Sequence, residues 1–207
     1  MPISQSVELI DVTKDAEMII MRNARVSNPN NEKSTNTNIL KYCFEKAHWS
    51  IFEQSYMTIR IETSRAMSAQ LIRHKSFSFQ EFSQRYAKVM DYVVCEPRRQ
   101  DLKNRQNSIN DLPVETMEWF AKAQDEHFQN SMSLYNQCLE KGVAKECARM
   151  LLPMSSKTVV NMSGNIRSWI HYLQVRMGPD TQAEHREIAS AIAEIFKKEL
   201  PTIGALL

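Results

Sequence analysis

The chain has 207 residues, of which 43% are hydrophobic, and a formal net charge of +2. This length allows one domain with a sizeable core, and so small a charge does not demand a nucleic-acid partner. The sequence does not open with a basic segment followed by an apolar run, so we expect no signal peptide. No run of eighteen apolar residues occurs, which excludes a transmembrane helix.

The first half of the chain is predicted to contain both strands and helices. Residues 57–62 alternate apolar and polar side chains, which is typical of a half-buried strand. The predicted elements are a strand over 7–12, a helix over 15–25, a helix capped by Asn36 or Thr37, a strand over 57–62 and a helix capped by Ser64. The last of these helices leads into the polar stretch 73–86.

The second half is predicted to be mostly helical. Its expected elements are a strand over 91–96, an irregular loop over 98–113, helices over 113–141 and 145–152, a strand over 157–162, a helix from Asn165 to Met177 and a last helix capped by Thr181. Gly142 is the expected end of the long helix. Few strands among many helices predict an α+β fold rather than repeated β-α-β units.

Glycine and cysteine usage excludes several kinds of site. Only four glycines occur, too few and too scattered for a G-x-G-x-x-G loop or a P-loop. A bound nucleotide would then be held largely by side chains. The four cysteines form no C-x-x-C pair, so we predict no metal site and expect reduced thiols, mostly in the core, in a cytoplasmic protein. They are Cys43, Cys95, Cys138 and Cys147.

Residues 73–86 hold the densest set of functional side chains. Its polar members are Arg73, His74 and Lys75 at the start and Glu81, Ser83 and Arg85 at the end. The last three would lie on one side of an extended chain. Phe77 and Phe79 would lie on that same side, so a bend or a helix end is expected before Glu81. Guanidinium forks suit phosphate, and residues 65–105 carry nine Lys or Arg against four Asp or Glu. A solvated basic loop above core phenylalanines is an equally simple interpretation.

The C-terminal third adds further cations near predicted helix ends. Arg167 and His171 are four residues apart on one helix and therefore share a face. Arg149 and Arg176 lie near the ends of their helices, where a cation is also favoured by the helix dipole alone. His171, among apolar neighbours, is equally compatible with a histidine of the core.

Six stretches together resemble the flavin-dependent thymidylate synthases. The first is Arg73-His74-Lys75, followed after seven residues by Ser83. The others, in the family's order, are Ala24-Arg25-Val26-Ser27, His48-x-Ser50-x-Phe52-Glu53, Ala148-Arg149-x-x-Leu152-Pro153, Asn165-x-Arg167-Ser168, and Leu173-x-x-Arg176 followed by Gln182-x-Glu184. Three positions depart from the pattern: Lys75 replaces a usual arginine, Gln80 an asparagine and Lys157 an aromatic residue.

The resemblance implies one catalytic domain over residues 1–207, with a small, largely antiparallel sheet and flanking helices. It implies that dUMP is converted to dTMP, with methylenetetrahydrofolate giving the carbon and FAD, reduced by NADPH, carrying the hydride. It also implies a homotetramer with shared active sites and no membrane partner. Arg176 would be the catalytic cation on the pyrimidine.

The same resemblance assigns binding residues. The dUMP contacts would be Gln70, Arg73, Glu81, Ser83, Gln84, Arg85, Arg149 and Arg176. The FAD contacts would be Ser27, His48, Ser50, Glu53, Arg73, His74, Lys75, Asn165, Arg167 and His171. Because no cysteine has an evident activating partner, attack by a thiolate is not expected. Ser83 is expected to bind phosphate rather than act as a nucleophile.

A nucleic-acid-binding protein is the alternative. Residues 65–105 combine cations with Phe77, Phe79, Phe82 and Tyr86, as in platforms that stack single-stranded bases.

Overall fold

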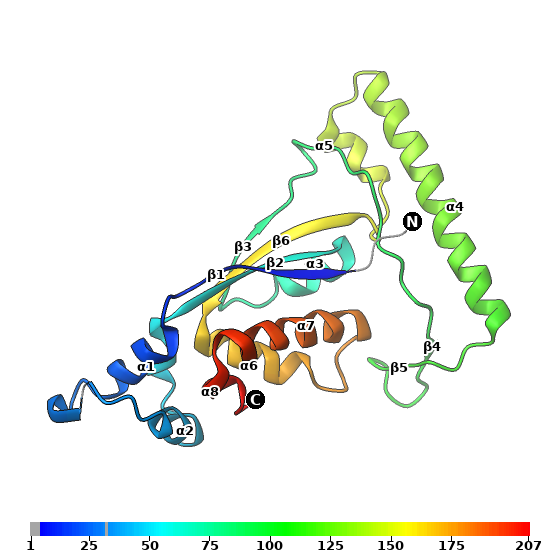
Figure 1. Cartoon of the computed structure of the whole chain (residues 1–207). Coiled ribbons are helices and arrows are strands. Elements are labelled where there is room, and N and C mark those ends of the chain that lie inside the picture. The colour runs from blue at the N-terminus through cyan, green and yellow to red at the C-terminus, as the bar shows by residue number, and fades with distance from the viewer. Residues whose placement is uncertain (1–4, 32) are drawn as a thin grey trace.

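A four-stranded antiparallel sheet with strand order β1-β2-β6-β3 is the centre of the fold (Figure 1). The structure, a computed structural model, describes residues 5–31 and 33–207, so the expectation about the first residues of the chain lies partly outside it. The strands are β1 (Ser6–Val12), β2 (Tyr56–Ser64), β3 (Ser78–Glu81) and β6 (Lys157–Asn165). β6 pairs with β2 along its whole length and with β3 on its other edge.

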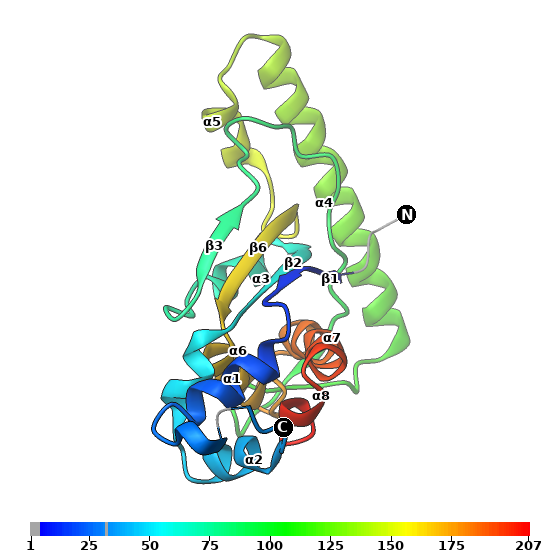
Figure 2. The same cartoon turned by 60° about the vertical axis from the view of Figure 1, so that its left-hand side comes forward.

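One face of the sheet packs on two C-terminal helices and forms the core. Met57, Ile59 and Ile61 of β2 are fully buried, whereas the residues between them are half-buried. The helices α6 (Ile166–Arg176) and α7 (Ala183–Glu199) lie beside this face in both views (Figures 1 and 2). The alternation predicted for β2 is confirmed, and the mixed α+β class with it.

Short helices close one end of the sheet. They are α1 (Ala16–Ala24), α2 (Asn38–Glu45), α8 (Pro201–Gly204) and the 3-10 segments η1 (Pro29–Asn31) and η2 (Trp49–Gln54). η2 contacts both α1 and α6, so it connects this end to the C-terminal helix layer. At the other end of β2, α3 (Arg65–Leu71) begins after Ser64, whose Oγ accepts a hydrogen bond from Met67 N at 3.2 Å. The predicted cap is confirmed.

The long helix α4 (Val114–Glu140) lies along the opposite end, with α5 (Lys145–Ala148) and η3 (Arg149–Leu151) against it. Its end is a Schellman motif: Gly142 has φ +79, its N–H donates to Leu139 O at 3.0 Å, and Val143 N donates to Cys138 O at 2.9 Å. Gly142 therefore ends the helix as predicted, because a residue with a side chain adopts this φ only with strain.

Several predicted elements are wrong. Residues 91–96 form no strand, because Cys95 N is bonded to the side chain of Gln124 on α4 and only an isolated bridge joins Tyr92 to Ser156. Part of the expected loop over 98–113 is a hairpin, β4 (Arg99–Gln100) with β5 (Ser108–Ile109). Thr181 is not a cap: α7 begins after Gln182, whose side chain makes no capping bond.

The four cysteines are free, but only Cys43 lies in the core; Cys95 and Cys138 are half-buried and Cys147 is exposed. The expectation of mostly buried thiols is thus wrong. In the part of the chain that the structure describes, no helix is long and apolar enough to cross a membrane.

Candidate active site

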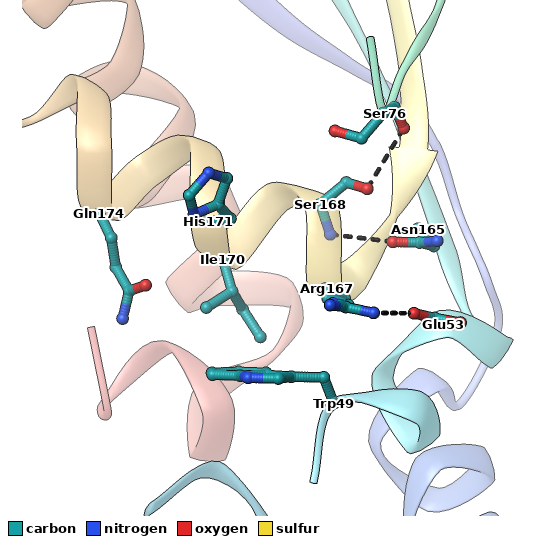
Figure 3. A pocket seen from close by; sticks show the side chains of 9 residues that line it. All are labelled: Trp49, Glu53, Ser76, Asn165, Arg167, Ser168, Ile170, His171 and Gln174. Carbon is teal, nitrogen blue, oxygen red and sulfur yellow. Dashed lines mark hydrogen bonds and ion pairs between the residues drawn. The ribbon is translucent and has the colours of Figure 1, made fainter. Parts of the chain in front are cut away.

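The junction of β6 and α6 forms one wall of a cleft (Figure 3). Asn165 ends the strand in an extended conformation, and its Oδ1 accepts a hydrogen bond from Ser168 N at 2.9 Å, which starts the helix. Ser168 Oγ donates in turn to Ser76 O at 3.2 Å. The loop after α3 is therefore held against the first turn of α6.

We call this cavity, of about 560 Å³ between η2 and α6, the α6 cleft. Its lining residues are Trp49, Glu53, Ser76, Asn165, Arg167, Ser168, Ile170, His171 and Gln174. An ion pair between Arg167 and Glu53 joins the two walls. Four of the residues assigned to flavin by resemblance, Glu53, Asn165, Arg167 and His171, are thus brought together.

Other residues assigned to flavin do not line this cleft. His48 is exposed at the start of η2, with its ring 5.8 Å from that of Tyr42, and Ser50 is exposed on the same segment. The remaining exposed members are Ser27, Arg73 and Lys75. The loss of the usual arginine fork at position 75 therefore affects an exposed side chain.

Sequence motifs missed four of the nine residues that line the cleft. Ile170 and Gln174 follow Arg167 by three and seven residues, so the helical spacing that joined Arg167 to His171 could have found them. Trp49 lies between two assigned residues, and its ring faces Ile170 across the cleft in Figure 3. No local sequence pattern indicates Ser76, because a hydrogen bond from the distant Ser168 brings it to the cleft.

Glu81, at the end of β3, lies in a polar cluster within the chain. Its Oε1 accepts hydrogen bonds from Ser68 Oγ at 2.6 Å and Thr158 Oγ1 at 3.0 Å, and Arg65 pairs with the same oxygen at 2.6 Å. After β3 the chain turns, as Tyr86 N donates to Ser83 O at 3.1 Å. The extended alternation expected from Glu81 to Arg85 therefore ends at Ser83. The bend or helix end expected before Glu81 is confirmed, because α3 ends at Leu71 and Phe77 lies in a bend before β3.

Arg85 and Arg149, both assigned to dUMP by the resemblance, meet at Glu146 on α5. Arg85 Nε lies 3.1 Å from Glu146 Oε2, and Arg149 Nε donates to the carbonyl of Glu146 at 3.3 Å. We call Arg85 and Arg149 the Glu146 pair. The neighbouring Gln84 is buried, and Ser83 Oγ accepts from Arg85 N at 3.4 Å, which holds this turn in place.

A second polar group surrounds the end of α6. Arg176 Nε donates to His74 Nε2 at 2.9 Å, and the His74 ring lies 5.0 Å from that of Tyr172. Burial, together with nearby Arg176 and His171, lowers the pKa of His74 to about 4. His74 is therefore neutral at pH 7, with its proton on Nδ1. The His185 ring lies 6.1 Å from that of His74, and Gln70 Oε1 lies 3.3 Å from His185 Nδ1. We call Gln70, His74, Arg176 and His185 the Arg176 group.

The Glu146 pair and the Arg176 group lie on different parts of one chain. α5 is near the upper end of the molecule and α6 lies below the sheet in both views (Figures 1 and 2). The elements that carry the two groups therefore lie apart in one chain.

The other two departures from the family pattern lie on the sheet. Lys157 Nζ pairs with Glu62 Oε2 at 2.6 Å, and Arg60 pairs with the same carboxylate. Lys157 and Arg60 lower the pKa of Glu62 against the opposing effect of burial. Gln80 is exposed on β3 opposite Asn161 of β6. The charge of Lys157, which stands where the family has an aromatic residue, is thus paired with a carboxylate on the neighbouring strand β2.

Acid is expected to weaken the fold through two histidines. Burial, with Arg176 and His74, lowers the pKa of His185 to about 4 as well. The unfolded chain binds these protons near pH 6.5, so their contribution to stability is complete above pH 6.5 and is lost as the pH falls through about 4. Each proton adds a slope of about 1.4 kcal/mol per pH unit in that window. Urea unfolding from pH 7.5 to 4 measures it.

The control for this measurement is His185→Gln, which should lose about half of the histidine slope while every carboxylate still titrates. If the dependence of stability on pH were unchanged in this variant, His185 would not be neutral in the folded chain between about pH 4 and 6.5.

Comparison with known proteins places this fold in a family. The family model described as Thymidylate synthase complementing protein matches residues 8–202. A relative from Paramecium bursaria Chlorella virus 1, named a probable flavin-dependent thymidylate synthase, is 50% identical over 98% of each chain. The flavin-dependent thymidylate synthase of Synechocystis is 50% identical over 92% of this chain and 89% of its own.

A solved structure of a nucleotide methylase shares this fold. A crystal structure of the UMP/dUMP methylase PolB from Streptomyces cacaoi, bound with 5-Br dUMP, superposes with a TM-score of 0.88 over 99% of this chain and 94% of that one, at 23% identity. The family model and the two relatives define the class of protein. The chain belongs to the flavin-dependent thymidylate synthase family.

Proposed function

We propose that this chain acts as a single catalytic domain that methylates dUMP to dTMP. Methylenetetrahydrofolate would supply the carbon, and FAD, reduced by NADPH, would supply the hydride. The α6 cleft carries the proposal, because its polar donors include the residues that the family resemblance assigns to flavin. Family membership and the methylase fold support the same reaction.

The α6 cleft fits a flat, anionic cofactor. Its volume of about 560 Å³ lies within the usual range for small-molecule sites. Trp49 and Ile170 give it an apolar wall, and Arg167 gives it a cation that suits phosphate. Arg167 already pairs with Glu53, so an incoming anion would share or replace that carboxylate.

The remaining residues of this chain would bind and orient the nucleotide. The Glu146 pair offers two guanidinium groups for its phosphate. Arg176 would stabilise negative charge on the pyrimidine, and His74 aims it by accepting the Nε–H bond. A neutral His74 leaves the charge of this contact entirely on the arginine.

Two of the four cysteines, Cys43 and Cys95, are unsuited to act as thiolate nucleophiles. Burial and the nearby Glu184 raise the pKa of Cys95 to about 11, and burial raises the pKa of Cys43. Both thiols are therefore protonated at neutral pH and poor nucleophiles.

A nucleic-acid platform is less well supported than the enzyme. Phe77 is buried in the core, and Phe79 and Phe82 are half-buried, so three of the four rings proposed for stacking are not free to receive bases. Tyr86 alone of these four is widely exposed, at 79%.

The test is flavin binding and turnover by the purified chain. We expect a yellow protein after incubation with FAD, and dTMP formation when dUMP, methylenetetrahydrofolate and NADPH are added. Arg167→Gln should weaken FAD binding about tenfold or more, since a hydrogen bond to a charged group contributes roughly 1.5–3 kcal/mol.

The matched control is Arg22→Gln, which removes an exposed cation from α1, outside the cleft. A native chain that stays colourless, and whose melting temperature does not change with FAD, would contradict the proposal. Equal weakening in the control would show that Arg167 has no special role.

We also propose a homotetramer with active sites shared between chains. The separation of the Glu146 pair from the Arg176 group supports this arrangement, since a neighbouring copy can supply the group that one chain lacks. Closed symmetric assembly is the common way to achieve it.

A further inference from the structure

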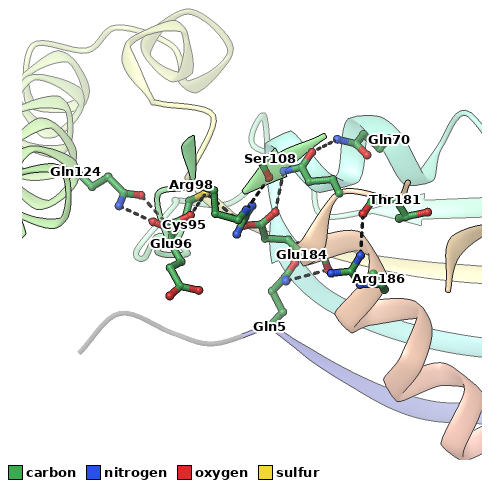
Figure 4. A network of polar contacts seen from close by, with 11 residues as sticks. Gln5, Gln70, Cys95, Glu96, Arg98, Ser108, Gln124, Thr181, Glu184 and Arg186 are labelled. Atoms are coloured by element: carbon green, nitrogen blue, oxygen red, sulfur yellow. Dashed lines mark hydrogen bonds and ion pairs between the residues drawn. The ribbon is translucent and has the colours of Figure 1, made fainter. Parts of the chain in front are cut away.

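Glu184, near the start of α7, is a buried carboxylate with a complete set of donors (Figure 4). Its Oε1 accepts from Arg98 at 2.6 Å and from Cys95 Sγ at 3.4 Å, and its Oε2 accepts from Gln182 Nε2 at 2.9 Å. Burial alone would raise the pKa of Glu184, but Arg98 and Gln182 hold it below its usual value. Glu184 is therefore ionised at neutral pH.

An ionised carboxylate can only accept hydrogen bonds, and this fixes the next residue. Gln182 must turn its NH₂ group towards Glu184, which directs its Oε1 to Gln70. Gln70 Nε2 donates to that oxygen at 2.7 Å. The amide of Gln70 is thus oriented with its nitrogen towards Gln182 and its own oxygen on the other side.

The oxygen of Gln70 in turn fixes the tautomer of His185. Gln70 Oε1 lies 3.3 Å from His185 Nδ1, and an amide oxygen only accepts, so Nδ1 carries the proton. His185 Nε2 is then free to accept from Tyr172 OH at 3.1 Å. His185 is fully buried and neutral, so every link in this chain of bonds has one direction.

We propose that Glu184 is a positioning residue which, through Gln182, fixes the amide orientation of Gln70 and the Nδ1–H tautomer of His185. The role of Gln70 towards dUMP rests on the proposed function. With one N–H bonded to Gln182, the second N–H of Gln70 is left to donate to a bound ligand. An inverted amide would present an oxygen there instead.

Arg98 extends this arrangement to the hairpin. Its Nε donates to Ser108 Oγ of β5 at 3.0 Å, while its NH2 group holds Glu184. The segment between β3 and α4 is thereby anchored to the same carboxylate that orients Gln70.

The test replaces the carboxylate by its neutral isostere, Glu184→Gln. If Arg98 keeps the amide oxygen, the new NH₂ group faces Gln182, both glutamine amides invert, and the proton of His185 moves to Nε2. Histidine side-chain ¹⁵N NMR distinguishes the two tautomers, and the His185 signals are those missing from His185→Gln. We expect Nδ1–H in the native chain, Nε2–H in Glu184→Gln, and dUMP binding about tenfold weaker in calorimetry.

The matched control is Glu187→Gln, the same change about one turn further along α7 at an exposed position. It should keep the Nδ1–H tautomer and the native affinity for dUMP. A second variant, Tyr172→Phe, removes the other partner of His185 and should also keep Nδ1–H, because Gln70 still requires it. This variant tests the direction of the bonds even if Glu184→Gln does not fold.

Three outcomes would overturn the proposal: Nδ1–H retained in a folded Glu184→Gln chain, a shift to Nε2–H in Tyr172→Phe, or unchanged dUMP affinity after the tautomer has moved. Failure of the proposed function looks different. The native chain and Glu187→Gln would then form no dTMP, while the His185 tautomer, which needs no substrate, would still be Nδ1–H.

Discussion

Arg176→Ala is expected to abolish dTMP formation while FAD remains bound. Arg176 lies in the group around the end of α6, bonded to His74, and does not line the α6 cleft. Loss of a preorganised charge that stabilises a transition state costs about a hundred- to a thousandfold in rate, and more when no other cation replaces it. Single-turnover dTMP formation and the flavin absorbance of the same sample measure both halves of the prediction.

Arg176→Lys should also form dTMP much more slowly than the native chain. The guanidinium donates from Nε to His74 and has two further nitrogens for the substrate, whereas one ammonium cannot hold both partners in the same geometry. Arg22→Ala, an exposed arginine of α1, is the control and should be fully active. Near-native turnover by Arg176→Lys would show that charge alone suffices.

Mixed assemblies of two inactive variants should recover activity. Arg85→Ala and Arg176→Ala remove residues from the Glu146 pair and the Arg176 group, which we assign to one nucleotide but to different chains. Each pure variant should be inactive. In random one-to-one mixtures, about a quarter of the sites would receive neither defect, so about a quarter of the native rate should return.

The control for mixing uses two defects on the same side of the site. Arg85 and Arg149 both contact Glu146 of one chain, so a mixture of Arg85→Ala with Arg149→Ala leaves every site defective and should stay inactive. Native mass spectrometry verifies that chains have mixed. Mixed assemblies of Arg85→Ala with Arg176→Ala that remain wholly inactive would rule out the sharing of these two arginines.

Local signals predicted two of the helix starts correctly. Ser64 and Asn165 each accept a hydrogen bond from the backbone N–H three residues ahead, a contact that depends only on neighbouring sequence. β3 was missed because it exists through pairing with β6, a strand far along the chain. Residues 91–96 were mistaken for a strand because their sequence favours one but no neighbouring strand pairs with Cys95. The side chain of Gln124 takes the hydrogen bond from Cys95 N instead.

Only some members of the candidate site, and not their grouping, were predictable from the sequence. Family motifs supplied Glu53, Arg167 and His171, which the fold brings to one cleft. They also supplied Arg85 and Arg176 as ligands of one nucleotide, and nothing local indicates that these lie apart on one chain. The bonds from Glu184 to His185 depend on side-chain directions that only the packing of α3, α6 and α7 defines.

The pairing of β2 with β6 also determines when the site can form during synthesis. Tyr56 pairs with Asn165, so the two walls of the α6 cleft are joined by contacts of very high sequence separation. Contacts of this kind form late, because a long loop must close before they contribute. The cleft therefore cannot exist on a nascent chain until α6 has left the ribosome, and a cofactor bound there stabilises the completed fold without guiding the first half of the chain.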